Sequence, residues 1–184
     1  VDLRLPLGAD AAIEIVTAKD PQGGTVIRHS AEHVMADAVK RLFPAVQIDV
    51  GRTDHAEKFQ YDFLIDRPFT PDDLARIEDE MRRIVAENAG FERRVVSRAD
   101  AKALFESMGE TLKVARLADI PEGDDITLFA HGGFVDLCRG PHVQRTDQIG
   151  AFKLLESAGA YWRGDERNPM LQRIYGIAFA SKKE

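Results

Sequence analysis

Two short clusters of ionisable side chains stand far apart in the chain. The first is His29-Ser-Ala-Glu-His33, and the second is Cys138-Arg-Gly-Pro-His142. Each places two imidazole or thiol groups four residues apart, and together they use the single cysteine and three of the five histidines. Such side chains bind zinc or, without metal, orient a water molecule and accept its proton. The chemistry therefore depends on whether the fold brings the two clusters together.

The first cluster is expected on a helix from about His29 to Phe43, stopped by Pro44. Each helical residue turns by about 100°, so His29 and His33 lie on one face. The apolar side chains lie on the opposite face, which should be buried, and the histidine pair then points to solvent or into a cleft. These apolar residues are Ala31, Val34, Met35, Ala38 and Leu42. Taken alone, such a pair is more often solvated than functional.

The second cluster follows a predicted hairpin with strands at 126–130 and 134–138. Side chains alternate along a strand, so Asp136 and Cys138 share one face. Arg139-Gly-Pro then turns the chain and presents His142. Alone, a cysteine of this kind is as often a small buried hydrophobe as a functional group.

Taken together, the two clusters allow two kinds of site. Four nitrogen and sulfur ligands are a plausible zinc set, and if three of them bind, an open position holds an activated water. Without metal, the same groups orient a water by hydrogen bonds and act as a general base. Spacing alone leaves both alternatives open. The residues concerned are His29, His33, Cys138 and His142.

The elements that must position these clusters mix helices and strands without regular βαβ alternation. This mixture favours an α+β fold, a two-layer sandwich of helices on a mainly antiparallel sheet. A linker is expected at 20–24, and helices are expected at 70–88 and 98–108, the first begun by Thr70-Pro-Asp-Asp. Strands are expected within 1–17 (around Leu3/Leu5 and Ile13/Ile15) and at 46–50, 59–65, 91–96, 112–117, 149–155 and 171–179.

Bulk properties narrow the class of protein. The 184 residues suffice for one domain with a full core, and 44% hydrophobic and 30% charged residues are typical of a globular protein. No apolar run approaches the roughly 18 residues of a membrane span, and no signal peptide opens the chain. A single cysteine excludes an internal disulfide, which favours a cytoplasmic setting. The net charge of −6 argues against a general nucleic-acid binder. The absence of an initiator Met and strand-like ends predict a fragment of a longer polypeptide.

Several segments resemble the editing domain of bacterial threonyl-tRNA synthetases over about residues 25–180. The first cluster alone is weak, because alanyl-tRNA synthetase editing domains share it, whereas the last two segments are far more specific. Two of these segments contain the clusters described above, and the second of them begins at Val135-Asp136. The others are Gly109-Glu-Thr-Leu-Lys113-Val114, Gly159-Ala-Tyr-Trp-Arg-Gly-Asp165 and Met170-Leu-Gln-Arg-Ile-Tyr-Gly176.

The resemblance implies a domain organisation. Residues 1–20 correspond to the end of a small β-grasp domain and a linker, and residues 21–184 to the editing domain. The ATP-using ligase domain, which also binds zinc, would follow residue 184. The parent enzyme would be a cytoplasmic homodimer.

The resemblance also implies an activity, hydrolysis of the ester of serine wrongly attached to threonine tRNA, with threonyl-tRNA spared. Serine is threonine without a methyl group, and a pocket that fits threonine discriminates against it by only about 1–3 kcal/mol. A second pocket too small for the methyl group admits serine and excludes threonine.

Matches to the family motifs imply a role for individual residues of this chain. Lys113 and His29 would hold and activate the attacking water, and Asp136 would lie beside the substrate amine. Tyr61 matches a pocket tyrosine, although Lys58-Phe-Gln-Tyr61 departs from the usual Gly-Phe-Tyr-Tyr. The remaining cluster residues would shape the pocket and polarise the ester: His33, Cys138 and His142.

The family's editing site generally uses no metal, so no cofactor is expected for this chain. One alternative is a zinc-dependent deacylase of the alanyl-related type, with the four cluster residues as ligands. Another is a non-catalytic tRNA-binding module. Stacking and phosphate contacts to the tRNA 3′ end are expected from residues near the C-terminus, although packing is an equal alternative. These are Tyr161, Trp162, Arg163 and Arg173.

Overall fold

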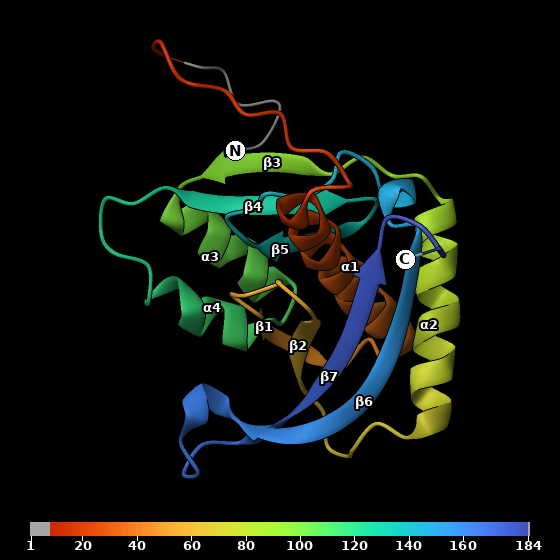
Figure 1. Ribbon diagram of the computed structural model, residues 1–184. Coiled ribbons are helices and arrows are strands. Elements are labelled where there is room, and N and C mark those ends of the chain that lie inside the picture. Colours follow the sequence, from red (N-terminus) through yellow and green to blue (C-terminus); the bar gives the residue numbers. More distant parts are fainter. Residues whose placement is uncertain (1–7, 184) are drawn as a thin grey trace.

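The computed structural model describes residues 8–183, which form four α-helices and seven β-strands (Figure 1). The helices are α1 (Pro21–Leu42), α2 (Pro71–Ala86), α3 (Arg98–Ser107) and α4 (Thr111–Leu117). The strands are β1 (Gln47–Gly51), β2 (Phe59–Leu64), β3 (Glu92–Val96), β4 (Ile126–His131), β5 (Phe134–Leu137), β6 (Ala151–Tyr161) and β7 (Met170–Phe179).

All strand pairs among the described residues are antiparallel, and they form two sheets. The strand orders are β1-β2-β7-β6 in the four-stranded sheet and β3-β4-β5 in the three-stranded sheet. The predicted α+β class is confirmed, as is the hairpin of β4 and β5. What the sequence did not indicate is the division of the strands between two sheets.

Helix α1 lies at the centre of the molecule and packs against α2, β2 and β7 (Figure 1). The predicted start near His29 was wrong, because the helix begins at Pro21 after the N-cap residue Asp20. Gly23, predicted to lie in a linker, is inside the first turns, where an added Cβ would stand 2.0 Å from the carbonyl oxygen of Thr17. Close approach of the preceding backbone therefore explains a glycine that otherwise reads as a helix breaker.

The predicted apolar stripe of α1 is buried except at its end, where Leu42 is half-buried, and Ala31, Val34 and Met35 are fully inaccessible. The histidine face is largely enclosed, because His33 is only 2% exposed and His29 is half-buried. The ring of His33 packs edge-on against Phe134, which lies in the three-stranded sheet. The middle of α1 is therefore covered on both faces, and its polar face reaches solvent only in part, at His29.

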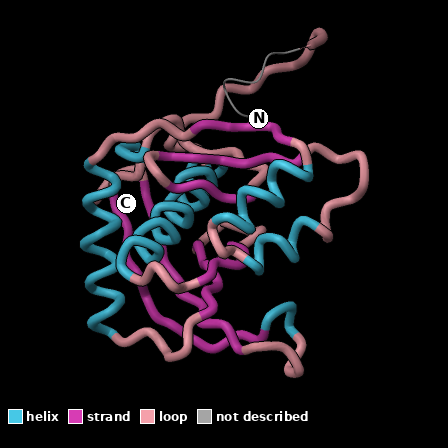
Figure 2. The backbone as a smooth tube through the Cα atoms, turned by 180° about the vertical axis from the view of Figure 1, so that it is seen from behind, coloured by secondary structure: helices cyan, strands magenta, loops and turns pink. Residues whose placement is uncertain are grey.

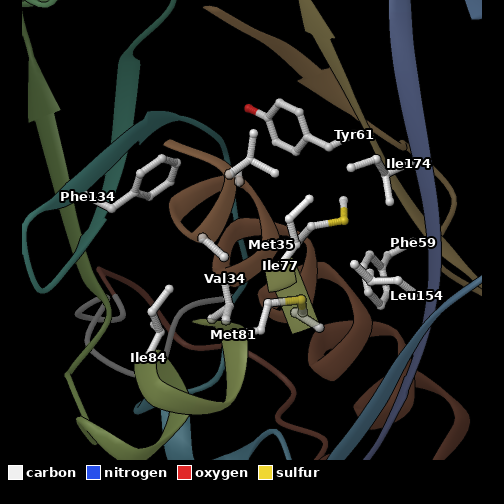
Figure 3. Close-up of a cluster of buried hydrophobic side chains, with 14 of the residues drawn as sticks. Val34, Met35, Phe59, Tyr61, Ile77, Met81, Ile84, Phe134, Leu154 and Ile174 are labelled. Carbon is white, nitrogen blue, oxygen red and sulfur yellow. The ribbon is translucent and has the colours of Figure 1, made fainter. Parts of the chain in front are cut away.

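Two hydrophobic cores hold the elements. The first joins α1, α2 and the four-stranded sheet, and Figure 3 shows Met35, Met81 and Phe59 converging within it. Tyr61 lies at the edge of this cluster, with its hydroxyl oxygen directed away from Met35 and Ile174 (Figure 3). The second core lies between α3, α4 and the three-stranded sheet, and it contains Ala101, Phe105, Leu117, Ile126 and Leu128.

Helix α4 replaces the strand predicted at 112–117, and this prediction was wrong. The helix buries Leu112, Lys113 and Leu117. A run of six residues with scattered apolar positions fits both the spacing of a helix and the alternation of a strand. The contacts of the residues that begin the run then decide between the two. Here Gln47 accepts hydrogen bonds from the backbone N–H and the hydroxyl of Thr111, which fixes the first turn of α4 against β1.

The segment before α1 contains no helix or strand among its described residues, so the strand expected at Ile13 and Ile15 was wrong. These side chains are 72% and 84% exposed, so burial does not support a strand there. In Figures 1 and 2 this segment runs away from the helices and sheets. The strand expected around Leu3 and Leu5 lies outside the described residues.

None of the described helices combines the length and apolarity that a membrane crossing needs.

Candidate active site

The two clusters meet. The Sγ of Cys138 lies 3.3 Å from the Nε2 of His29 and 3.3 Å from the Nε2 of His142. The rings of His29 and His142 are 4.1 Å apart, and those of His33 and His142 are 4.3 Å apart. Helix α1 supplies two of these side chains, and the turn after β5 supplies the others.

The turn after β5 is fastened to α1 by hydrogen bonds. The Oγ of Ser30 accepts from the backbone N–H of Val143 at 3.0 Å and lies 3.2 Å from Nδ1 of His142. The Nδ1 of His29 lies 3.1 Å from the carbonyl oxygen of Pro141. Gly140 has a φ of 74°, and an added Cβ there would meet the ring of Phe129 at 2.6 Å. Only glycine fits this turn, so the spacing from Cys138 to His142 depends on it.

Lys113, Asp136 and Tyr61 form a second polar group beside the cluster. Lys113 Nζ donates to the Tyr61 hydroxyl at 2.6 Å and pairs with Asp136 Oδ1. The Tyr61 hydroxyl donates to Asp136 Oδ2 at 2.5 Å, and the N–H of Leu137 donates to Oδ1 at 2.7 Å. Each of the three side chains belongs to a residue that is 1% exposed. A buried charge pair needs such additional hydrogen bonds to offset its lost hydration.

Two of the cluster histidines, His29 and His33, are held in their neutral form by burial. Burial lowers the pKa of His29 and lowers that of His33 well below the ordinary value. His33 Nδ1 is 3.8 Å from Asp136 Oδ2, and within the described part of the chain it has no hydrogen-bond partner. Neutral imidazoles can accept a proton, which is what a general base must do.

Glu32 and His55 are part of the site, although the sequence did not single them out. Glu32 Oε1 accepts from the backbone N–H groups of Arg52 at 2.8 Å and Gln60 at 3.2 Å. Its Oε2 lies 3.1 Å from Nε2 of His55. Burial raises the pKa of Glu32 to about 8 and lowers that of His55 to about 4. Glu32 stands three residues after His29 and so shares its helix face, which is the signal that could have found it.

A small cavity opens among these groups, with a volume of about 130 Å³. It contains the four side chains that the resemblance associates with water and substrate, His29, Lys113, Asp136 and Tyr61. The other lining residues are Glu32, His33, Val50, Gly51, Arg52, Leu137 and Cys138. The predicted site residue His142 is not among these lining residues, and it contacts two of them: its Nε2 lies 3.3 Å from Cys138 Sγ, and its ring lies 4.3 Å from that of His33.

Two sets of side chains place possible metal ligands within 4.8 Å of one another. One is the predicted zinc set of His29, His33, Cys138 and His142, and the other is His29, Glu32 and His55. The sulfur–nitrogen separations of the first set suit a tetrahedral zinc ion with bonds of about 2.0–2.3 Å. Zinc needs a thiolate, however, and burial raises the pKa of Cys138 to about 12. The donors fit zinc, whereas the thiol is protonated in the absence of metal.

The residues expected to seat a tRNA terminus do not line the cavity. Arg173 donates twice to Asp62, at 2.6 and 2.8 Å. Arg163 pairs with Asp119 at 3.0 Å and lies over the Trp162 ring at 4.8 Å. Tyr161 is 43% exposed at the end of β6. Their contact with tRNA stays a prediction. Tyr161, Trp162 and Arg163 lie at the turn between β6 and β7.

Comparison with known proteins gives consistent matches. The family model described as "Threonyl and Alanyl tRNA synthetase second additional domain" matches residues 126–175. The chain is 53% identical over its full length to a threonine–tRNA ligase of Pelobacter propionicus and covers 29% of that protein. It is 54% identical over 181 residues to the Solidesulfovibrio magneticus enzyme of the same name, with 98% of the chain and 28% of the relative covered. The Coxiella burnetii protein of that name is 50% identical over the full chain, which covers 28% of it. The chain thus spans less than a third of the length of these relatives.

Proposed function

This chain is homologous along its whole length to one segment of the bacterial threonine–tRNA ligases, and on that premise we propose that it is their editing domain. Its substrate is threonine tRNA that carries serine at the 3′ end, and its reaction is hydrolysis of the ester. Threonyl-tRNA is spared, because the additional methyl group does not fit. A ligase pocket alone discriminates by only about 1–3 kcal/mol for one methyl group, so a second pocket has a clear purpose.

The observation that carries this proposal is the cavity itself. It is small, and neutral imidazoles lie next to a lysine that is held by a carboxylate and a phenol. This combination suits attack of water on an ester carbonyl, which needs a proton acceptor and a group that positions the water.

The mechanism assigns a role to each side chain. Lys113 and His29 hold the water, and His29 accepts its proton as the water oxygen bonds to the acyl carbon. The bond from that carbon to the ribose oxygen then breaks, and the proton passes to the ribose oxygen. Serine and free tRNA leave. Asp136 lies beside the amine, and Tyr61 fixes the position of Lys113 relative to Asp136. His33 and Cys138 shape the pocket and polarise the ester, and His142 does so through its contacts with these two side chains.

The ligand geometry favours a second candidate, a zinc-dependent deacylase of the alanyl-related type. The four cluster residues would hold the ion, and zinc would supply a bound water of lowered pKa. We propose the metal-free reaction, since Cys138 and the rings of His29 and His142 already form a connected hydrogen-bonded group.

The domain organisation, within this chain and beyond it, is also a matter of proposal. Residues 1–20 would be the end of a preceding small β-grasp domain and a linker, and residues 21–184 would form the editing domain. The ligase domain would use ATP and zinc, and it would form the homodimer.

The decisive experiment presents serine-loaded and threonine-loaded threonine tRNA to the chain, with and without a zinc chelator. We expect release of serine at a rate well above release of threonine, and no effect of the chelator. The His29→Ala and Lys113→Ala variants should lose serine release while remaining folded. The ligase from which the chain comes, measured in parallel, controls for weak tRNA binding by the separate domain.

Each outcome separates the alternatives. Serine release that stops with the chelator and returns with zinc favours the zinc-dependent enzyme. Release of neither amino acid, by the chain and by the whole ligase, leaves the non-catalytic tRNA-binding module. Equal release of both removes the proposed selectivity.

A further inference from the structure

The cationic residues that line the cavity, among those that the structure describes, are Lys113 and Arg52. Lys113 is buried, pairs with Asp136 and donates to the Tyr61 hydroxyl. Its charge is therefore balanced inside the site. Arg52 directly follows β1, and its side chain is 34% exposed. A residue that lines the cavity and also reaches solvent lies at the mouth of the cavity.

The backbone of Arg52 is held, whereas its guanidinium has little to bind. The backbone N–H donates to Glu32 Oε1 at 2.8 Å. In the described part of the chain the guanidinium makes one ion pair, in which Nη2 lies 4.0 Å from Oδ2 of Asp54. This distance is too long for a hydrogen bond, and the Asp54 side chain is itself 69% exposed, so the pair contributes little. The N–H donors of the guanidinium are therefore available to a ligand.

The positive charge of Arg52 lies close to the groups that act on the ester. Burial and, next, the charge of Arg52 lower the pKa of His55 to about 4. The ring of His55 is 4.6 Å from the ring of His29, which is the proposed proton acceptor. A ligand bound by the guanidinium would therefore lie beside an ester placed at His29.

The proposed substrate carries an anion in this position. The ribose that holds the aminoacyl ester also holds, at its 5′ oxygen, the phosphate that joins the last two nucleotides. The groups that act on the ester occupy the buried part of the cavity, so the phosphate is expected at the mouth. The planar fork of an arginine matches two phosphate oxygens, and such charged hydrogen bonds are strong.

The other arginines considered for this role are already committed. Arg173 donates twice to Asp62, and Arg163 pairs with Asp119, and neither arginine lines the cavity. Arg28 is 8% exposed, and its Nε donates to the carbonyl oxygen of His55. Arg52 is therefore better placed than these three residues to meet a phosphate next to the ester.

We propose that the guanidinium of Arg52 binds the phosphate between the last two nucleotides of the tRNA. The inference rests on the proposed function, since it concerns the substrate of the same cavity. It gives a chain of net charge −6 a local cation for a polyanion, at a cavity where the charge of Lys113 is already balanced.

The test compares two seryl-tRNAs with the wild-type chain and Arg52→Gln. The last linkage of the first tRNA is the natural phosphodiester, and that of the second is an uncharged methylphosphonate. We expect the wild-type KM for serine release to rise about 10-fold with the uncharged linkage, as for loss of a hydrogen bond to a charged group. Arg52→Gln should have this higher KM on both tRNAs. We expect little change in kcat, because the phosphate is bound equally before and during the reaction.

Arg76→Gln is the matched control. Arg76 is also exposed, and its pair with Asp73 is long at 3.8 Å, but it lies on α2 and does not line the cavity. This variant should respond to the two linkages as the wild type does. Salt gives a second measurement: the slope of log KM against log salt should be smaller by about 0.7 in Arg52→Gln and unchanged in Arg76→Gln.

Two results would overturn the proposal. One is a wild-type KM in Arg52→Gln, and the other is a further rise of its KM with the uncharged linkage, because Arg52 and the phosphate would then act independently. Should Arg52→Gln not fold, Arg52→Met keeps the apolar part of the side chain and takes its place in the same comparison.

Failure of the proposed function looks different. If the wild-type chain and the whole ligase release no serine from the natural seryl-tRNA, the function fails and the inference with it. If they release serine and their KM is the same for both linkages, only the inference fails.

Discussion

Single residues in this site act through shared hydrogen bonds, and the clearest example is Tyr61. Its hydroxyl accepts from Lys113 and donates to Asp136, so one phenol fixes the distance between the two charges. Burial raises its pKa well above the ordinary value, which keeps the phenol protonated and able to donate. Tyr61 is therefore a positioning residue for Lys113 as well as part of the cavity wall.

Tyr61→Phe should leave the fold intact and weaken both stability and hydrolysis. Loss of hydrogen bonds to charged partners should lower the free energy of unfolding by about 1.5–3 kcal/mol. Serine release should fall at least 10-fold, because the Lys113 ammonium loses the partner that holds it near the water. Urea unfolding and the release assay measure the two effects. Tyr175→Phe, at a half-buried position of β7 outside the cavity lining, is the control. An unchanged rate in Tyr61→Phe would contradict the positioning role.

At the scale of elements, helix ends decide where the site residues stand. Helix α2 begins with a reciprocal cap, in which Thr70 Oγ1 accepts from the N–H of Asp73 and Asp73 Oδ2 accepts from the N–H of Thr70. Arg67 adds a charged hydrogen bond to the same carboxylate at 2.6 Å. This arrangement fixes α2 against α1, and α1 carries the first cluster.

The pKa of Asp73 makes this cap testable. The Arg67 hydrogen bond, with those from Thr70, holds that pKa well below its ordinary value. A lowered pKa in the folded state stabilises the fold fully above the unfolded pKa of about 3.9, and the stabilisation disappears as pH falls toward the folded value. Asp73→Asn should therefore cost about 1 kcal/mol at pH 7 and progressively less below pH 4.

Urea unfolding from pH 7 to pH 3 measures this difference. Asp72→Asn changes an exposed carboxylate in the same turn and should have a much smaller effect at every pH. A cost for Asp73→Asn that stays constant over this range would show that its charge is not what stabilises the cap.

At the scale of the whole molecule, the site forms where the regions of the two hydrophobic cores meet, and Phe134 of β5 joins them by packing in the first core. His29 and Tyr61 come from the region of the first core, which contains α1, α2 and the four-stranded sheet. Lys113 and Asp136 come from the region of the second core, which contains α3, α4 and the three-stranded sheet. Their hydrogen bonds cross the boundary between the regions, so activity depends on both cores.

Phe105→Ala tests this arrangement. Phe105 is fully buried in the second core, and its truncation should cost about 3–5 kcal/mol. Hydrogen exchange should increase in α3, α4 and β4, with α1 and α2 still protected, and serine release should fall because α4 carries Lys113. Phe69→Ala in the first core should give the reverse pattern, with exchange increased in α2 and unchanged in α4. Uniform exchange in both variants would mean that the two cores unfold as one unit.

The sequence by itself determined the elements whose pattern is long or strongly marked. It predicted α2 from its cap and its helical spacing, the β4–β5 hairpin from its turn, and the common face of Asp136 and Cys138 from strand alternation. Its residue types also named His29, His33, Cys138 and His142 as candidates for one site, but left open whether the fold brings the two clusters together. These features are local, or follow from chemistry that does not depend on the fold.

Only the tertiary structure decided the rest, because packing between distant segments outweighs local preference. It extended α1 through Gly23, where a neighbouring backbone fills the space of a side chain, and it made a helix of 111–117 through contacts with β1. It brought Cys138 next to His29 across 109 residues of sequence. It added Glu32 and His55 to the site, and burial there set the protonation of the groups, which no spacing along the chain reveals.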